Sequence, residues 1–117
     1  MIPAQTLNLT GKVALISGAG VGIGRAVALA LGQAGAFIGI HYYSSKEGAE
    51  KLLDELSAQN IKAMLLPADL TNEEEADGVV DKLVAKAGRL DILVNNSGGL
   101  VKRAKIEDCS LENWNKS

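Results

Sequence analysis

The sequence predicts an α/β protein: a doubly wound parallel sheet with strand order 3-2-1-4 and helices on both faces. Four apolar runs, each too short for a helix, are typical of strands buried in such a sheet. Three longer segments between them carry apolar residues at helical spacing. Strands and helices alternate with short connections, as they do when helices join parallel strands. A chain of 117 residues has room for one such domain.

The first strand is expected over residues 13–16, after a loose tail and a turn at residues 7–11. A turn dense in glycine follows, and then a helix that Gly35 should end in a left-handed conformation. The apolar stripe of this helix is expected at Ile23, Val27, Ala30, Leu31 and Ala34.

The second strand is expected over residues 37–41. The pattern Ser44-x-x-Glu47 predicts a capping box at the start of the second helix, and Asn60 can end that helix. Its apolar stripe consists of Ala49, Leu52, Leu53 and Leu56.

The third strand is expected over residues 61–66, and Thr71-x-x-Glu74 predicts a second capping box. Gly88 should end the third helix, before a fourth strand at residues 90–94. The stripe of this helix consists of Ala76, Val79, Val80, Leu83, Val84 and Ala87.

The turn after the first strand has the clearest chemistry. Gly18, Gly22 and Gly24 let the backbone turn sharply and approach a ligand. The following helix points its unpaired N–H groups and dipole at this place, so an anion is the natural occupant, and a pyrophosphate fits. The spacing is not the usual Gly-x-Gly-x-x-Gly. The alternative is a glycine-rich turn that serves packing alone.

The loop resembles that of the short-chain dehydrogenase/reductase family, which reads Thr-Gly-x-x-x-Gly-Ile-Gly, with a serine here for the threonine. The resemblance implies a Rossmann-type fold and a cofactor contact by seven residues of this loop. These residues are Ser17, Gly18, Gly20, Val21, Gly22, Ile23 and Gly24.

A second segment, Asn95-Asn96-Ser97-Gly98, resembles the family pattern Asn-Asn-Ala-Gly at the end of the fourth strand. The resemblance implies that Asn95 steadies the sheet and that the backbone of Ser97 and Gly98 lies against the cofactor ribose. It covers nearly the whole chain, so residues 7–117 are expected to form an NAD(P)-binding domain.

The cofactor is expected to be NADP, with NAD as the alternative. The acid that selects NAD normally ends the second strand, but this chain has Tyr42 there. The hydroxyls of the turn and the nearby cation of Lys46 could hold a ribose 2′-phosphate, and no carboxylate would repel it. The expected contacts are His41, Tyr42, Tyr43, Ser44 and Ser45. After the third strand, the resemblance places the adenine against Ala68, Asp69 and Leu70.

No catalytic residue can be assigned, because the family's Tyr-x-x-x-Lys, Ser and Asn have no match in these residues. The chain is therefore expected to be the cofactor-binding part of an oxidoreductase, truncated before the fifth strand. A fourth helix should begin at Ser110. The full enzyme would move a hydride between a nicotinamide and a small carbonyl or alcohol substrate, and the turn after the second strand hints at a 3-oxoacyl reductase.

Other classes of function stay open. One is a dinucleotide-binding module or redox sensor without catalysis, and another is a methyltransferase on the same half-fold, against which Asn95-Asn96-Ser97-Gly98 argues. A P-loop NTPase is excluded, because no Gly-Lys-Ser/Thr follows the loop.

Composition limits the partners. The net charge of −2 offers no field for nucleic acid, and the small basic cluster at residues 102–105 is expected to be a solvated loop. The single cysteine, Cys109, suits a reducing compartment. No signal peptide, membrane span or metal site is indicated, so we expect a cytoplasmic protein that forms a homo-oligomer when full length.

Overall fold

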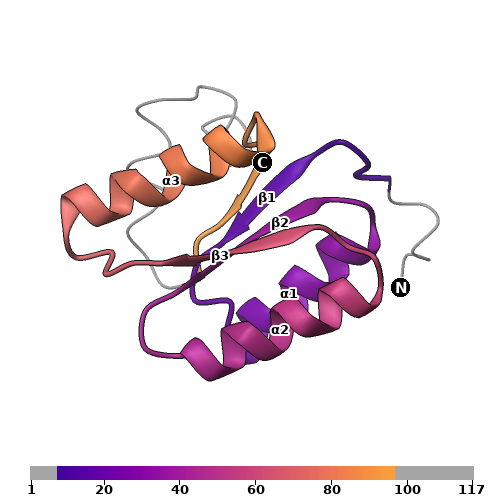
Figure 1. Ribbon diagram of the computed structural model, residues 1–117, viewed down its shortest axis with the longest axis horizontal. Helices are drawn as coiled ribbons and strands as arrows, with labels where there is room; N and C mark the ends of the chain where they lie inside the picture. Colours follow the sequence, from indigo (N-terminus) through magenta and orange to yellow (C-terminus); the bar gives the residue numbers. More distant parts are fainter. Residues whose placement is uncertain (1–7, 97–117) are drawn as a thin grey trace.

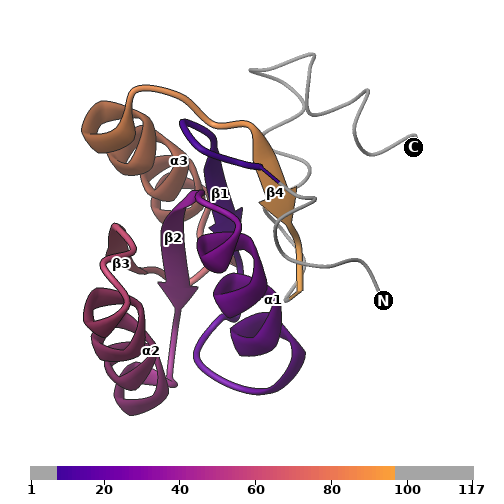
Figure 2. The same ribbon diagram turned by 90° about the vertical axis from the view of Figure 1, so that its right-hand side faces the viewer.

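The computed structural model of the protein describes residues 8–96, which form a four-stranded parallel sheet in the order β3-β2-β1-β4. The predicted fold class and strand order are confirmed. Helices α1 and α2 lie on one face of the sheet and α3 lies on the other (Figures 1 and 2). The elements are β1 (Val13–Ile16), α1 (Gly22–Gln33), β2 (Phe37–Tyr42), α2 (Lys46–Ala58), β3 (Ala63–Pro67), α3 (Glu73–Ala87) and β4 (Ile92–Val94).

The core has two layers, one on each face of the sheet. Along β1, Val13 and Leu15 belong to the layer under α3, whereas Ala14 and Ile16 belong to the layer under α1 and α2. This alternation is the period of two expected of a strand whose two faces are both covered. The predicted stripe of α2 is confirmed, and that of α3 is confirmed except at Val84, which is 38% exposed. The buried members of the two stripes are Ala49, Leu52, Leu56, Ala76, Val79, Val80 and Leu83.

The predicted stripe of α1 is only partly correct. Val27 and Leu31 are half-buried against the core and Ala34 is buried, but Ala30 is exposed and Ile23 is 75% exposed. The fully buried residues within α1 are Gly24, Ala28 and Gly32. The reason is distance: a Cβ built on Gly32 would lie 3.0 Å from Cγ2 of Ile61. The helix packs so closely that only very small residues fit on its inner face, and hydrophobic spacing does not reveal such a face.

Both predicted capping boxes are wrong by one residue. Helix α2 begins after Ser45, which makes no side-chain cap bond, so Ser44 lies outside the helix. Helix α3 is capped by Asn72, whose Oδ1 accepts the N–H of Glu75 at 3.1 Å. The hydroxyl of Thr71 is used elsewhere, because it donates to Oδ1 of Asp69 at 2.7 Å.

The helix ends agree with the prediction. Gly35, Asn60 and Gly88 have left-handed φ values of 112°, 62° and 89°. After α2, the N–H of Ile61 returns to the carbonyl of Leu56 at 2.9 Å, which satisfies one of the last carbonyls of the helix. Ile61 therefore belongs to the helix end, and β3 starts at residue 63 instead of residue 61.

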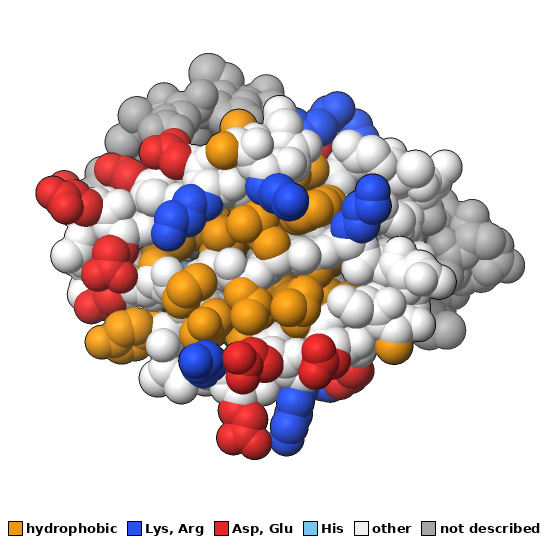
Figure 3. Space-filling model, in the orientation of Figure 1, with side chains coloured by type: hydrophobic (Ala, Val, Ile, Leu, Met, Phe, Trp, Pro, Cys, Tyr) orange, Lys and Arg blue, Asp and Glu red, His pale blue; other side chains and the backbone are white. Residues whose placement is uncertain are grey.

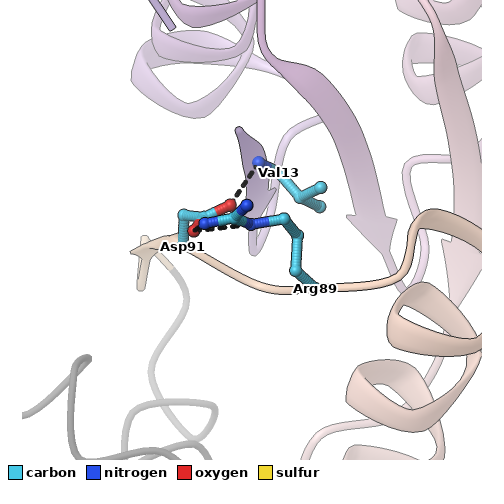
Figure 4. A network of polar contacts seen from close by, with 3 residues as sticks. All are labelled: Val13, Arg89 and Asp91. Carbon is cyan, nitrogen blue, oxygen red and sulfur yellow. Dashed lines mark hydrogen bonds and ion pairs between the residues drawn. The ribbon is translucent and has the colours of Figure 1, made fainter. Parts of the chain in front are cut away.

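Strand β4 starts at Ile92 instead of Leu90, and the residue before it ties the amino ends of two strands together. One oxygen of the Asp91 carboxylate accepts the N–H of Val13 at 2.8 Å, and the other accepts Nη2 of Arg89 at 2.7 Å (Figure 4). Burial raises the pKa of Asp91, but these hydrogen bonds and the nearby positive charges outweigh it, so its pKa lies below the ordinary value.

Strand β3 forms one edge of the described sheet, because it pairs only with β2. Apolar side chains gather over this edge, between charged side chains on either side (Figure 3). Met64 and Leu65 are only partly buried there, while exposed Lys62 and Pro67 flank the edge. A charge and a proline at the two ends of a short edge strand discourage pairing with another chain. The helix expected from Ser110 and the fifth strand lie outside the described residues.

Candidate functional site

The carboxyl ends of β1, β2 and β3 open into a cavity of about 290 Å³. It lies where a doubly wound sheet binds its ligands. The loops after all three strands contribute, so the structure brings together nine of the predicted site residues and adds Thr71. The lining residues are Gly18, Val21, His41, Tyr42, Tyr43, Ser44, Ser45, Asp69, Leu70 and Thr71.

Larger hollows of about 860 and 420 Å³ lie at the opposite, amino ends of the strands. Their linings include Gly35, Asn60 and Ala87, which lie at the carboxyl ends of α1, α2 and α3. Three helix carboxyl ends present carbonyl oxygens and negative dipole ends there, although Lys12 and Lys62 also line the hollow of about 420 Å³. For an anionic ligand we favour the smaller cavity, because its lining includes Gly18 and Val21 at the amino end of α1.

The loop after β1 depends on glycine for two different reasons. Gly18 and Gly22 have φ values of 63° and 59°, which side chains rarely allow. Gly24 is needed for space, because a Cβ there would lie 2.5 Å from the carbonyl oxygen of Gly18. Likewise, a Cβ on Gly20 would lie 2.8 Å from the carbonyl oxygen of Ser45. The loop is thus folded against itself and against the start of α2.

The amino end of α1 offers its N–H groups to a ligand. Val21 occupies the cap position and has no side-chain oxygen that could accept a hydrogen bond, and the first turn contains no acidic residue. Helix α3 is the opposite case, with a side-chain cap from Asn72 and the acidic first turn Glu73–Glu75. The uncapped amides of α1 and the positive end of its dipole suit a phosphate group.

The loop is held in place from two neighbouring strands. The N–H of Ala19 donates to the carbonyl of His41 in β2 at 2.9 Å. After β4, Nδ2 of Asn96 donates to the carbonyl of Gly18 at 3.3 Å. Sequence reasoning missed Asn96 as a support of the loop, although it stands inside the Asn95-Asn96 motif that drew attention.

Asp69 is fixed on the far wall of the cavity. Its Oδ1 accepts the N–H of Thr71 at 3.0 Å and the hydroxyl of Thr71, and these bonds hold its pKa below the ordinary value. Its own N–H donates to Oε1 of Glu75 at 3.0 Å. Asp69 is therefore ionised at neutral pH, and Oδ2 makes no bond within the described residues. The local sequence pattern did not predict that Glu75 accepts the N–H of Asp69.

The turn after β2 presents hydroxyls to the cavity. Tyr42 is still part of β2, one residue beyond the predicted end, and it packs into the core under α1 and α2. Tyr43 is 68% exposed, and Ser44 is exposed beside it. Asp69 is the one acid among the residues that line the cavity in the described part of the chain.

The remaining predicted residues divide into three groups. Ala68 is buried behind the cavity, and its N–H donates to the carbonyl of Tyr42 at 3.0 Å. Ser17 is buried at the end of β1, with Oγ at 3.5 Å from Oδ1 of Asn95. Ser97 and Gly98 lie outside the described residues.

Two further properties concern residues 8–96 as a whole. None of their helices combines the length and the apolar character that a membrane crossing requires. Within the same residues, His, Cys, Asp and Glu side chains do not gather in groups of three that could hold a metal ion.

The strand order, the glycine loop and the uncapped helix behind it define a Rossmann-type α/β protein. The family model described as short chain dehydrogenase matches residues 12–117. The chain belongs to this family.

Relatives and solved structures agree with the assignment. An uncharacterized oxidoreductase of Methylorubrum extorquens is 42% identical over 109 residues, which are 93% of this chain and 44% of that protein. Versicolorin reductase of Emericella nidulans is 36% identical over 99% of this chain and 44% of its own length. The chain thus spans less than half the length of these relatives. A short chain dehydrogenase of Burkholderia cenocepacia, solved in complex with NADP, superposes with a TM-score of 0.75 at 37% identity. That match covers 78% of this chain and 37% of the other.

Proposed function

We propose that the protein is the nucleotide-binding part of an NADP(H)-dependent oxidoreductase, formed by residues 7–117. The observation that carries this proposal is the uncapped amino end of α1 behind Gly18 and Gly22, beside the cavity. The family assignment and the related structure solved with NADP support it. A nicotinamide dinucleotide supplies hydride chemistry to whichever carbonyl or alcohol the whole enzyme takes.

The residues present would each hold one part of the dinucleotide. Amides of the loop between Gly18 and Gly24 would bind the diphosphate, and Oδ2 of Asp69 would accept from the adenine amino group. The hydroxyls of Ser44 and Ser45 and the start of α2 would hold a ribose 2′-phosphate. No residue of the described chain is assigned to the chemical step, so we expect this chain alone to bind the nucleotide without turning over a substrate.

The preference for NADP has a physical basis in the turn after β2. An NAD-selecting carboxylate would repel a 2′-phosphate, and no acid stands at Tyr42, Tyr43, Ser44 or Ser45. The guanidinium of Arg25, close in sequence to the loop, pairs with Glu55 of α2. We therefore expect the 2′-phosphate to rely on hydroxyls, amides and the exposed Lys46 at the start of α2, with NADPH binding tighter than NADH.

Changing Ser44 to Asp tests this preference. A carboxylate beside a 2′-phosphate should weaken NADPH binding by about tenfold or more, which corresponds to about 1.4 kcal/mol, and leave NADH binding equal or tighter. Isothermal titration with both nucleotides measures the change, and Ser44→Asn supplies the same size without the charge. Tighter binding of NADH by the unaltered protein would contradict the preference for NADP.

A dinucleotide-binding module or redox sensor without catalysis is the second candidate, because none of the described residues is assigned to the reaction. The discriminating observation is the encoded sequence that follows Ser117. A Tyr-x-x-x-Lys pattern there would support the oxidoreductase, and a coding sequence that stops at Ser117 would favour the module. A cytoplasmic location and a homo-oligomer of the longer enzyme belong to the same proposal.

A further inference from the structure

His41 lies behind the candidate site with both ring nitrogens hydrogen-bonded to backbone. The residue is 2% exposed. Its Nδ1 lies 3.0 Å from the amide nitrogen of Gly18, which donates to it. Its Nε2 lies 2.9 Å from the carbonyl oxygen of Ala68. The ring therefore spans from the glycine loop after β1 to the segment after β3, next to Asp69.

The two partners fix the tautomer of the ring. The N–H of Gly18 can only donate, so Nδ1 must present its lone pair. The carbonyl of Ala68 can only accept, so Nε2 must carry the hydrogen. Only the neutral ring with hydrogen on Nε2 makes both bonds, and protonation would set an N–H on Nδ1 against the N–H of Gly18.

We propose that His41 is a positioning residue for the nucleotide: its neutral ring ties the glycine loop to the adenine wall and so sets the width of the cleft. This inference rests on the proposed function. It assigns His41 no contact with the nucleotide, unlike the expectation drawn from the sequence. Because one rigid ring joins the N–H of Gly18 to the carbonyl of Ala68, loss of the bond to Gly18 in particular would loosen the loop that the ligand needs in place.

The charges around the ring leave it neutral. Burial lowers the pKa of His41 below its ordinary value, and the hydrogen bond to Ala68 opposes this only partly. His41 lies on the same face of β2 as Gly39, which is the face that α3 covers, and its ring bonds the loop after β1 and the segment after β3. Strand β1 has no titratable side chain, Asp69 is turned toward Thr71, and the first turn of α3 carries exposed carboxylates. Tyr42 and Tyr43 follow on its own strand.

The sign of the pH effect follows from the lowered pKa. The contribution of the neutral ring is complete above the unfolded pKa of about 6.5 and is lost as the pH falls below that value toward the folded pKa. The ring of the folded protein takes up a proton only near its lowered pKa, so nucleotide affinity should fall only at a pH clearly below the ordinary pKa of histidine. The 2′-phosphate of the ligand also titrates near pH 6, so the test must separate the two effects.

Two variants separate the two hydrogen bonds that the His41 ring makes, one to Gly18 and one to Ala68. In His41→Asn, the amide oxygen can replace Nδ1 and accept the N–H of Gly18. The asparagine side chain does not titrate in the pH range of the experiment. In His41→Gln, the longer amide can replace Nε2 and donate to Ala68, while Gly18 loses its acceptor. Binding of NADP⁺, which is stable in acid, is measured by isothermal titration from pH 5.5 to 8. Exchange of the Gly18 amide hydrogen is followed by NMR without any ligand.

At pH 7.5, His41→Asn should bind NADP⁺ within about threefold of the unaltered protein, and His41→Gln should bind about three- to tenfold more weakly. Toward pH 5.5, protonation of the 2′-phosphate should lower the affinity of both proteins. The affinity of the unaltered protein should fall further than that of His41→Asn. The Gly18 amide should exchange slowly in the unaltered protein and in His41→Asn, and faster in His41→Gln or in acid.

Equal affinities and equal Gly18 exchange in both variants would overturn the inference. So would an identical fall in affinity for His41→Asn and the unaltered protein. If the unaltered protein binds no NADP⁺, the proposed function fails, and the exchange of the Gly18 amide still decides whether His41 holds the loop. If His41→Gln does not fold, the comparison of His41→Asn with the unaltered protein across pH provides the test.

Discussion

Gly24→Ala is expected to weaken NADPH binding by about tenfold or more and to lower the free energy of unfolding by about 1–3 kcal/mol. The added Cβ would lie 2.5 Å from the carbonyl oxygen of Gly18 and 2.9 Å from Nδ2 of Asn96. The Asn96 side chain can move, but the Gly18 carbonyl is part of the loop that should bind the diphosphate. Either α1 withdraws from the loop or the loop changes shape, and both outcomes remove aligned amides.

The measurement pairs an NADPH titration with a urea unfolding curve for each variant. Gly78→Ala is the matched control, because Gly78 also lies in a helix but has no atom within 4 Å of an added Cβ. The control should keep its affinity and gain about 0.5–1 kcal/mol, since alanine favours the helix. A Gly24→Ala protein that gains stability and binds NADPH normally would show that the close packing behind the loop is unimportant.

Gly48→Ala should have a comparable effect from the other side of the loop. Gly48 lies in the first turns of α2, and a Cβ there would overlap the carbonyl oxygen of Gly20. Because that atom belongs to backbone, α2 must move away from the loop. We expect a loss of about 1–3 kcal/mol in the free energy of unfolding and weaker binding of NADPH, with selective weakening at the 2′-phosphate.

The ratio of NADPH to NADH affinity separates this prediction from simple destabilisation. A shift of α2 moves Ser44 and Ser45, so NADPH should lose more than NADH. Gly78→Ala again serves as the control. Equal losses for the two nucleotides would argue that the start of α2 does not hold the 2′-phosphate.

Patterns that depend on local chemistry were predictable from the sequence. The run Val13–Ile16 forms β1 as expected, because four apolar residues before a glycine turn suit a strand buried on both faces. Asn60 and Gly88 end their helices because few other residues tolerate a left-handed φ. The strand order followed from strict alternation of strand and helix, since right-handed crossovers leave few topologies.

Features set by distant parts of the chain were not predictable. The inner face of α1 is small because a neighbouring side chain, Ile61, lies close to Gly32, and no periodicity records that distance. The cap of α3 is a local exception: Thr71 bonds Asp69 two residues before it, and Asn72 caps the helix in its place.

The candidate site divides in the same way. That the glycine loop and Asp69 lie beside one cavity was predictable, because the loops after parallel strands meet at one edge of the sheet. The supports behind them were not, because His41 reaches Gly18 and Ala68 across 23 and 27 residues of sequence. A histidine at a strand end gives no local sign of its partners, and only the fold shows which backbone groups its ring reaches.

Titration of the isotope-labelled protein with NADPH and NADH, followed through its backbone amide signals, tests the central claim most directly. We expect saturable binding, with the largest changes between Gly18 and Gly24, at Ser44 and Ser45, and at Asp69. NADPH should bind tighter than NADH. A folded protein whose loop amides stay unchanged at saturating concentrations of both nucleotides would contradict the claim that this loop binds a dinucleotide.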